Sequence, residues 1–264
     1  MIQVWSEGAA DEHMPEEILV GLEAIIRRHP WWIARSKLTL GLLDQLGVRP
    51  PARVLDAGCG WGTTLKSLER AGYRAAGMDI SRRMLERLDR DRPGRSLHVA
   101  DITRPLPAGI EPFDAVLALD VIEHIDDDRG AVSRLSELVA PGGVLIVSVP
   151  ALPDFFTEFD EIQGHRRRYL PESLRAAFGS SPLRVERIFW WGRWLVPLLG
   201  RQRRNRKGQA GEPAAETYRR YLGLPPWPGP LVMRLAFALE RGRALSGKLP
   251  TGTSLFAVAR RAER

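Results

Sequence analysis

Residues 53–62, RVLDAGCGWG, decide the fold that this sequence predicts. Arg53, Val54 and Leu55 are typical of the end of a buried strand, and the three alternating glycines that follow indicate a tight turn. Asp56 therefore stands where the chain leaves the sheet. A ligand bound at this turn must tolerate a carboxylate, so its charge is the first property that the sequence constrains.

Short apolar runs alternate with helical patterns along the chain from about residue 51 to residue 150. Such alternation implies right-handed crossovers and a parallel sheet covered on both faces, that is, a doubly wound, Rossmann-like α/β core. The helical patterns of this core lie around 62–71, 81–90 and 128–139. The expected strands are 53–58, 74–80, 96–102, 113–120, 143–150 and 183–191, with a last strand at 254–260.

The flanking segments are expected to complete a single decorated domain. Residues 1–50 carry two helical patterns, at 15–28 and 31–47, and are expected to form an N-terminal helical cap. Residues 51–192 form the core. Residues 193–264 are expected to contribute a basic and apolar insertion, an amphipathic helix at about 229–243 and the final strand of the same domain.

Composition restricts the class of protein. The 264 residues include one cysteine, Cys59, so an intramolecular disulfide framework is excluded and a reducing cytoplasm fits. No basic segment followed by an apolar core opens the chain, and no uncharged stretch reaches the roughly 18 residues of a membrane-spanning helix. We expect a cytoplasmic protein without a membrane span.

An aspartate follows each of four successive expected strands: Asp56, Asp79, Asp101 and Asp120. Ligands of an open parallel sheet bind outside the carboxyl ends of its strands, so these acids form a rim around the expected site. A pyrophosphate beside Asp56 would cost about 1 kcal/mol in water at about 4 Å, and more near the interior. The third glycine of the dinucleotide fingerprint is also replaced, by Thr63.

A phosphate-free, positively charged nucleoside fits this rim, and S-adenosylmethionine is such a ligand. Asp56 is expected to anchor its ammonium group and Asp79 to accept hydrogen bonds from its ribose hydroxyls. Cys59 has no basic partner next to it in sequence and is expected to be a small filler residue without a catalytic role. The residues expected around the cofactor are Asp56, Gly58, Cys59, Gly60, Gly62, Asp79, Ile80, Asp101, Ile102 and Asp120.

Four longer stretches resemble the successive motifs of class I S-adenosylmethionine-dependent methyltransferases. They are VLDAGCGWGTTLKSLERAGYRAAGMDIS (54–81), ADITRPLP (100–107), FDAVLALDVIEHIDDD (113–128) and LVAPGGVLIVSVP (138–150). The resemblance covers about residues 50–191, and SLFAVAR (254–260) is similar to the antiparallel last strand of the class. It implies a seven-stranded sheet with six parallel strands and an antiparallel last one.

Two further segments narrow the resemblance. LDVIEHI together with GHRRRYLPESLRAAF is similar to the small-molecule branch related to quinone-pathway O-methyltransferases. HPWWIARSK resembles the helix that folds over the cofactor in this class, which places Trp32 as an apolar cover and Arg35 near the cofactor carboxylate. The acceptor does not follow from this resemblance, and we expect methyl transfer to a small, lipophilic or anionic acceptor, at oxygen.

The acceptor side is expected to be built after the fourth and fifth strands of the core. A hydroxyl acceptor must lose its proton, and His165 and His124 are the candidate bases. Arg166, Arg168 and Tyr169 are candidates for binding an anionic acceptor. No metal is expected, and the alternative is a divalent ion held by Asp120, Glu123 and His124.

The net charge of +7 hides an asymmetry that suggests other partners. Residues 1–164 carry 18 Lys and Arg against 26 Asp and Glu, whereas residues 165–264 carry 21 against 6. Three tryptophans (190, 191 and 194), the basic run 201–207 and Trp227 fit peripheral contact with an anionic membrane. The alternatives are an RNA methyltransferase, although a nucleic-acid partner is not favoured, and a noncatalytic protein that binds the cofactor.

Overall fold

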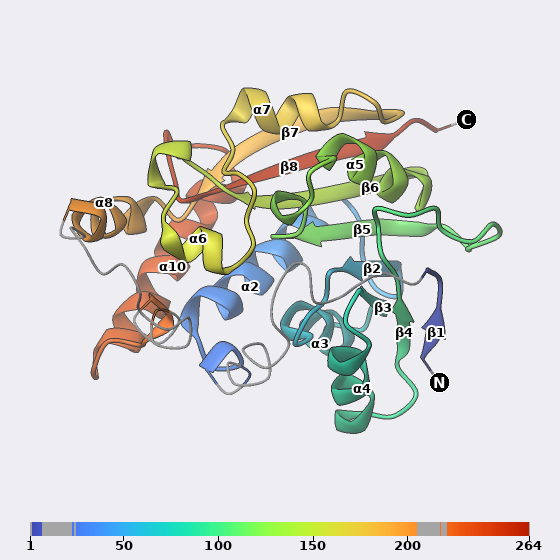
Figure 1. Ribbon diagram of the computed structural model, residues 1–264, viewed down its shortest axis with the longest axis horizontal. Coiled ribbons are helices and arrows are strands. Elements are labelled where there is room, and N and C mark those ends of the chain that lie inside the picture. The colour runs from blue at the N-terminus through green and yellow to red at the C-terminus, as the bar shows by residue number, and fades with distance from the viewer. Residues whose placement is uncertain (1, 7–22, 24, 205–216, 218–220, 264) are drawn as a thin grey trace.

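The computed structural model describes residues 2–6, 23, 25–204, 217 and 221–263. A single eight-stranded sheet runs through it in the order β1-β4-β3-β2-β5-β6-β8-β7 (Figure 1). Neighbouring strands are parallel except at β8, which is antiparallel to both β6 and β7. The strands are β1 (Gln3–Val4), β2 (Arg53–Ala57), β3 (Arg74–Asp79), β4 (Ser96–Val99), β5 (Phe113–Leu119), β6 (Val139–Pro150), β7 (Leu183–Trp191) and β8 (Ser254–Arg261).

All seven expected strands are present, and the Rossmann-like fold with its antiparallel last strand is confirmed. The eighth strand, β1, was not expected. It pairs two residues in parallel with the end of β4, and Trp5 N donates a hydrogen bond to Val99 O at 2.8 Å just beyond it. A two-residue strand is too short to produce a periodic pattern in the sequence.

Helices cover both faces of the sheet, as the alternation of patterns predicted. They are α2 (Pro30–Gln45), α3 (Thr63–Arg70), α4 (Arg82–Asp91), α5 (Asp128–Glu137), α6 (Glu158–Ile162), α7 (Pro171–Ala177), α8 (Val196–Arg204) and α10 (Gly229–Leu245). Short 3-10 turns are η2 (Ile122–His124), η3 (Pro153–Phe155) and η4 (Arg193–Leu195). Most of the expected helix at 15–28 and of the insertion at 201–217 lies outside the described residues.

The central strands are buried on both faces, because successive side chains point to opposite sides. Val54 packs with α2 and α10 on one face, and its neighbour Leu55 packs with α5 and α7 on the other. The same alternation separates Leu117 from Val116. This alternation fixes the register between neighbouring strands. It therefore also fixes where each strand ends along the edge of the sheet. No helix in the described part of the chain is both long and apolar enough to span a bilayer.

Helix α10 is held to the sheet by a buried carboxylate. Glu240 is 8% exposed and accepts hydrogen bonds from the backbone N–H groups of Gly192, Arg193 and Trp194, at 2.6, 3.1 and 3.2 Å. These N–H groups begin η4, where a helical turn leaves its donors without internal partners. Glu240 therefore caps η4 from a distant helix.

We expect Glu240→Ala to lower the free energy of unfolding by about 2–3 kcal/mol, because buried donors lose a charged acceptor. Urea unfolding followed by circular dichroism measures this change. Glu137→Ala, at an exposed position on α5, is the matched control and should stay within about 0.5 kcal/mol of the wild type. A Glu240→Ala protein as stable as this control would contradict the capping role.

Candidate functional site

The carboxyl ends of β2, β3, β4 and β5 meet at one edge of the sheet and bring the four expected aspartates there. Asp56 lies within β2 and Asp79 ends β3, while Asp101 and Asp120 follow β4 and β5. These strands are parallel neighbours. The rim predicted from the sequence is therefore present, but its four members have different surroundings.

Asp56 is the most buried member that faces the cavity described below. It is 3% exposed, and this burial raises its pKa to about 7. The positive charge of Arg35 offsets part of the rise, and the charge of Asp79 adds to it. Asp56 is thus close to half protonated at neutral pH and would gain from a cationic ligand.

Asp79 and Asp101 accept hydrogen bonds from backbone groups at the strand ends. The Asp79 carboxylate accepts hydrogen bonds from Gly60 N at 2.8 Å and from Ser81 N at 2.9 Å. Asp101 accepts from Thr103 N at 2.8 Å and Thr103 Oγ1 at 2.6 Å. Asp79 therefore shapes the glycine turn, and neither side chain lines the cavity.

Asp120 forms an ion pair with Arg35 of α2, and Ser148 Oγ donates to its other oxygen at 3.1 Å. The Arg35 guanidinium also lies 4.9 Å from the centre of the Trp31 ring. Asp120 has a φ of 58°, a left-handed conformation that is uncommon outside glycine. Such strain is typical of functional sites.

The glycine turn has two kinds of member. Gly58 and Gly60 line the cavity with positive φ values, and a Cβ at Gly60 would meet no atom within 4 Å. Gly62 instead faces Leu88 of α4, which a Cβ would approach to 2.7 Å, so it serves helix packing. Cys59 also lines the cavity, and burial raises the pKa of its thiol well above the usual range. That neutral thiol agrees with its expected role as filler.

A cavity of about 1070 Å³ opens beside this edge of the sheet. Its wall combines polar groups at the strand ends with a largely apolar surface from α2, α8, α10 and the segments around them. The apolar wall consists of Ile26, Trp31, Trp32, Phe155, Phe159, Trp194, Leu195, Leu198, Leu199, Leu222 and Met233. Ile80, Asp101 and Ile102, which were expected around the cofactor, do not line it.

A second hollow of about 800 Å³ lies at the opposite edge, where β2, β3, β4 and β5 begin. Arg53, Arg74, Ser96 and Phe113 are among the residues that line it. None of the four rim aspartates reaches it, and ligands of open parallel sheets bind at the carboxyl edge. The larger cavity is therefore the candidate site.

His165 lines the cavity and is oriented by a buried aspartate. Its Nδ1 lies 3.0 Å from Oδ1 of Asp160, which is fully buried and also bound by Arg168 at 2.7 and 3.0 Å. Burial opposes ionisation of Asp160, but the His165 hydrogen bond and the Arg168 charge hold its pKa below the usual range. Asp160 therefore places the proton of His165 on Nδ1 and leaves Nε2 as the basic nitrogen.

Asp160 was missed by the sequence analysis. It also accepts from Thr157 N at 2.9 Å, as the third helical residue of a capping box that begins α6. The pattern of Thr157 followed three residues later by Asp160 could have indicated the helix start. No local pattern could have indicated the contact with His165.

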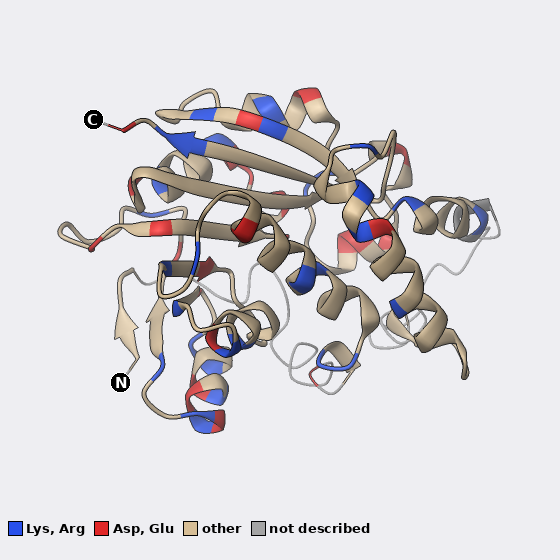
Figure 2. Cartoon of the chain, turned by 180° about the vertical axis from the view of Figure 1, so that it is seen from behind, with Lys and Arg blue, Asp and Glu red and all other residues tan. Residues whose placement is uncertain are grey.

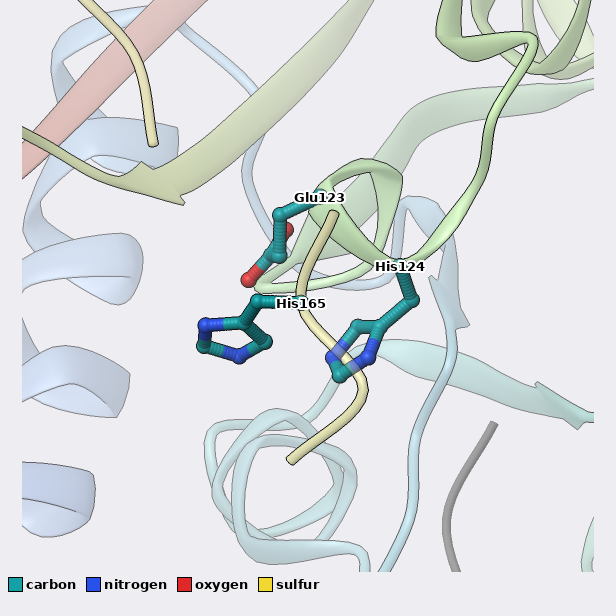
Figure 3. Close-up of side chains that lie close together, drawn as sticks. All are labelled: Glu123, His124 and His165. Carbon is teal, nitrogen blue, oxygen red and sulfur yellow. The ribbon is translucent and has the colours of Figure 1, made fainter. Parts of the chain in front are cut away.

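His124 and Glu123 lie beside His165 (Figure 3). The rings of His124 and His165 meet edge to face with centroids 4.7 Å apart. Glu123 is fully buried, and neither carboxylate oxygen has a hydrogen-bond partner. Burial and then the charge of Asp120 raise the pKa of Glu123 well above its usual range, which favours the protonated, uncharged form of this carboxyl group.

These three side chains are also the candidate metal ligands. One donor atom from each of Glu123, His124 and His165 lies within 4.8 Å of the others. The set differs from the expected one, because Asp120 is paired with Arg35 and His165 takes its place. The orphaned oxygens of Glu123 and the two imidazoles fit an ion such as Zn²⁺, whereas the adjacent charges of Arg35 and Arg168 oppose one.

The residues expected to bind an anionic acceptor are mostly elsewhere. Arg166 points toward Asp126, at 3.6 Å, and Arg168 lines the cavity while bound to Asp160. Tyr169 is 1% exposed, and its hydroxyl donates to Asp128 at 2.9 Å outside the cavity. The expectation for Tyr169 is thereby corrected, because its hydroxyl is already used in the protein interior.

Comparison with known proteins agrees with this geometry. A family model described as a methyltransferase domain matches residues 31–196. A ubiquinone biosynthesis O-methyltransferase from Ralstonia nicotianae is 31% identical over 133 residues, 46% of this chain and 56% of that protein. A malonyl-[acyl-carrier protein] O-methyltransferase from Pseudescherichia vulneris is 30% identical over 160 residues, 59% and 60% of the two chains. The matches thus span little more than half of these relatives.

Among solved structures, the complex between the Haloferax volcanii Trm112 methyltransferase activator and a methyltransferase contains a chain of similar fold. The TM-score is 0.60 with 18% sequence identity, over 97% of this chain and 99% of that one. At this identity the likeness concerns the fold. Because the family model covers more than half of the sequence, the chain belongs to the methyltransferase-domain family, within the class I S-adenosylmethionine-dependent methyltransferases.

Proposed function

We propose that this protein transfers a methyl group from S-adenosylmethionine to a hydroxyl oxygen of a small lipophilic acceptor, with His165 as general base. The observation that carries the proposal is that His165, in the wall of a largely apolar cavity, is hydrogen-bonded to the buried Asp160. The cofactor supplies a methyl group already activated on a sulfonium. The protein must align the acceptor, exclude water and take up the hydroxyl proton.

A hydroxyl acceptor fits the site better than a carboxylate. A carboxylate acceptor is ionised at neutral pH and needs no base, whereas a hydroxyl does. Two arginines that line the cavity are also occupied, Arg35 by Asp120 and Arg168 by Asp160. An anionic acceptor would therefore find the positive charge of both arginines already neutralised.

The size and lining of the cavity support two ligands, one of them apolar. Ligand pockets usually enclose roughly 300–1,000 Å³, so about 1070 Å³ leaves room for an acceptor beside the cofactor. The cofactor is proposed to lie against Asp56, Gly58 and Gly60, and the acceptor against the tryptophans and leucines near His165. Such an acceptor would be held in a bilayer, so we infer that the enzyme meets it at a membrane surface.

The first test replaces the base. We expect His165→Asn to lower kcat on a 4-alkylphenol by about 10²–10⁴-fold while cofactor affinity changes less than about twofold. On a nitro-substituted alkylphenol, which is ionised at the assay pH, the loss should nearly disappear because no proton remains to be removed. Radiolabelled methyl transfer measures both rates.

Asp160→Asn extends this test to a positioning residue. It should lower kcat on the neutral phenol without lowering it on the ionised one, because only the orientation and charging of His165 are affected. An equal loss on both phenols would show that His165 and Asp160 only maintain the structure. Turnover on fractionated RNA but on no phenol would favour the RNA alternative, and tight cofactor binding without any turnover the noncatalytic one.

Cofactor affinity is expected to depend on pH through Asp56. Because burial raises the pKa of Asp56 to about 7, an ammonium ligand that needs the carboxylate must displace a proton at lower pH. Affinity of the free enzyme for S-adenosylmethionine should therefore rise from pH 5.5 to 7, by up to about tenfold per unit, and then level off. Titration calorimetry in two buffers measures the affinity and the proton release.

Asp56→Asn should bind more weakly at pH 7.5 and lose this slope. The exposed Asp154→Asn is the matched control and should keep it. An unchanged slope in Asp56→Asn would assign the titration to another group.

Methyl transfer is expected to continue after exhaustive chelation, because the charges of Arg35 and Arg168 already lie next to Glu123. Activity is measured after dialysis against a chelator and again after addition of Mg²⁺ or Zn²⁺. A large loss that either ion restores would contradict this expectation. If the added ion then failed to restore activity in His124→Ala, the ion would be assigned to the set of Glu123, His124 and His165.

A further inference from the structure

Helix α10 carries a stripe of large apolar side chains on its outer surface. Leu231, Leu235 and Leu239 follow one another at intervals of four residues and are 49%, 56% and 81% exposed. Val232 lies beside them and is 56% exposed. Residues four apart share one side of a helix, so these side chains form one continuous stripe.

The stripe is not required for packing in the interior. The opposite side of α10 buries Phe237 and Ala244 against the sheet and α2, and it carries the Glu240 carboxylate inward to η4. A helix that only covers a core is polar on its outer side. The outer apolar stripe of α10 is thus an additional feature of this helix.

Arginines flank the stripe on both sides. Helical geometry places Arg234 and Arg241 along one border and Arg243 along the other, and all three are exposed. The acidic residue of α10, Glu240, is buried. In Figure 2 the ribbon of this helix is mostly tan, with some Lys or Arg positions in blue. We call Leu231, Val232, Arg234, Leu235, Leu239, Arg241 and Arg243 the α10 face.

We propose that the α10 face docks on an anionic membrane surface. Apolar side chains with arginines along the border match the acyl boundary and the phosphate groups of such a surface. Trp227, which is 84% exposed just before the helix, is of the residue type enriched at the interface. A second copy of the chain fits less well, because the stripe is about 12 Å long and a stable dimer buries about 800 Å² per partner.

This assignment changes which residues are expected to meet lipid. Trp191 was a candidate from the sequence, but it is 1% exposed and packs against Phe237 and Trp31, with ring centroids 5.1 and 5.4 Å away. The basic run at 201–207 lies largely outside the described residues. The outward leucines of α10 take the place of Trp191 in the expected membrane contact.

The α10 face lies next to the proposed acceptor site. Met233 of the same helix lines the cavity, as do Leu198 and Arg201 of α8 and Pro225. Leu198 is 51% exposed, so the apolar wall continues to the outside. If the proposed function is correct, docking would present this side of the cavity to a lipophilic acceptor in the bilayer.

The test measures binding to vesicles, independently of catalysis. The full chain is sedimented with phosphatidylcholine vesicles alone and with vesicles that contain about 30% phosphatidylglycerol. We expect at least tenfold stronger partitioning to the anionic vesicles. Leu231→Ser/Leu235→Ser/Leu239→Ser should lower it at least tenfold, and each Arg→Gln change at 234, 241 or 243 should lower it about fivefold at low ionic strength.

The matched control is Val4→Ser, an exposed apolar position on β1 at the other side of the sheet, which should partition like the wild type. The serine variant should retain its turnover of a water-soluble phenol, which separates docking from the proposed function. Equal partitioning of the serine variant and the wild type would overturn the proposal, as would a wild type that stays in the supernatant. A dimer that dissociates in the serine variant would assign the α10 face to self-association instead.

Discussion

The ion pair between Arg35 and Asp120 is the interaction on which the site depends. Parallel strands bring several carboxylates to one edge of the sheet, where burial and mutual repulsion make them costly. Arg35 pairs with Asp120 and also lowers the cost of the Asp56 charge. Because Arg35 stands on α2, the same contact holds this helix over the strand ends. The contact between Arg35 and Asp120 therefore both compensates the negative charges and holds α2 over the cavity.

The sequence predicted the sheet well because each strand has a strong local pattern. Residues 115–119 and 143–149 are buried on both faces, which produces largely apolar runs, and these runs end at Asp120 and Pro150. β1 escaped prediction because a two-residue strand is defined by its partner. The rim of aspartates was also predictable, since it follows from strand order. The roles of the individual aspartates could not be predicted, because they depend on local hydrogen bonds. Asp101 accepts one from Thr103, and Asp79 accepts one from the glycine turn.

The acceptor side was less predictable because its contacts join distant segments. His124 and His165 were both recognised as candidate bases, but 41 positions separate them, and only the fold places their rings in contact. Asp160 has an ordinary local role in starting α6, which conceals its contact with His165. Tyr169 illustrates the converse case: its sequence neighbours suggest a ligand contact, whereas its hydroxyl is used by Asp128.

The basicity of the proposed base, His165, further restricts which kinds of hydroxyl group could be the acceptor. An ordinary imidazole has a pKa of about 6.5 and a phenol one of about 10, so complete proton transfer before methylation would cost about 5 kcal/mol. For a hydroxyl as weakly acidic as water, about 15.7, the cost rises to about 12 kcal/mol. Asp160 stabilises the imidazolium only as it forms, so it assists a transfer in which the proton leaves as the methyl group arrives. The proposed reaction is therefore better suited to a phenolic or enolic hydroxyl than to an aliphatic alcohol.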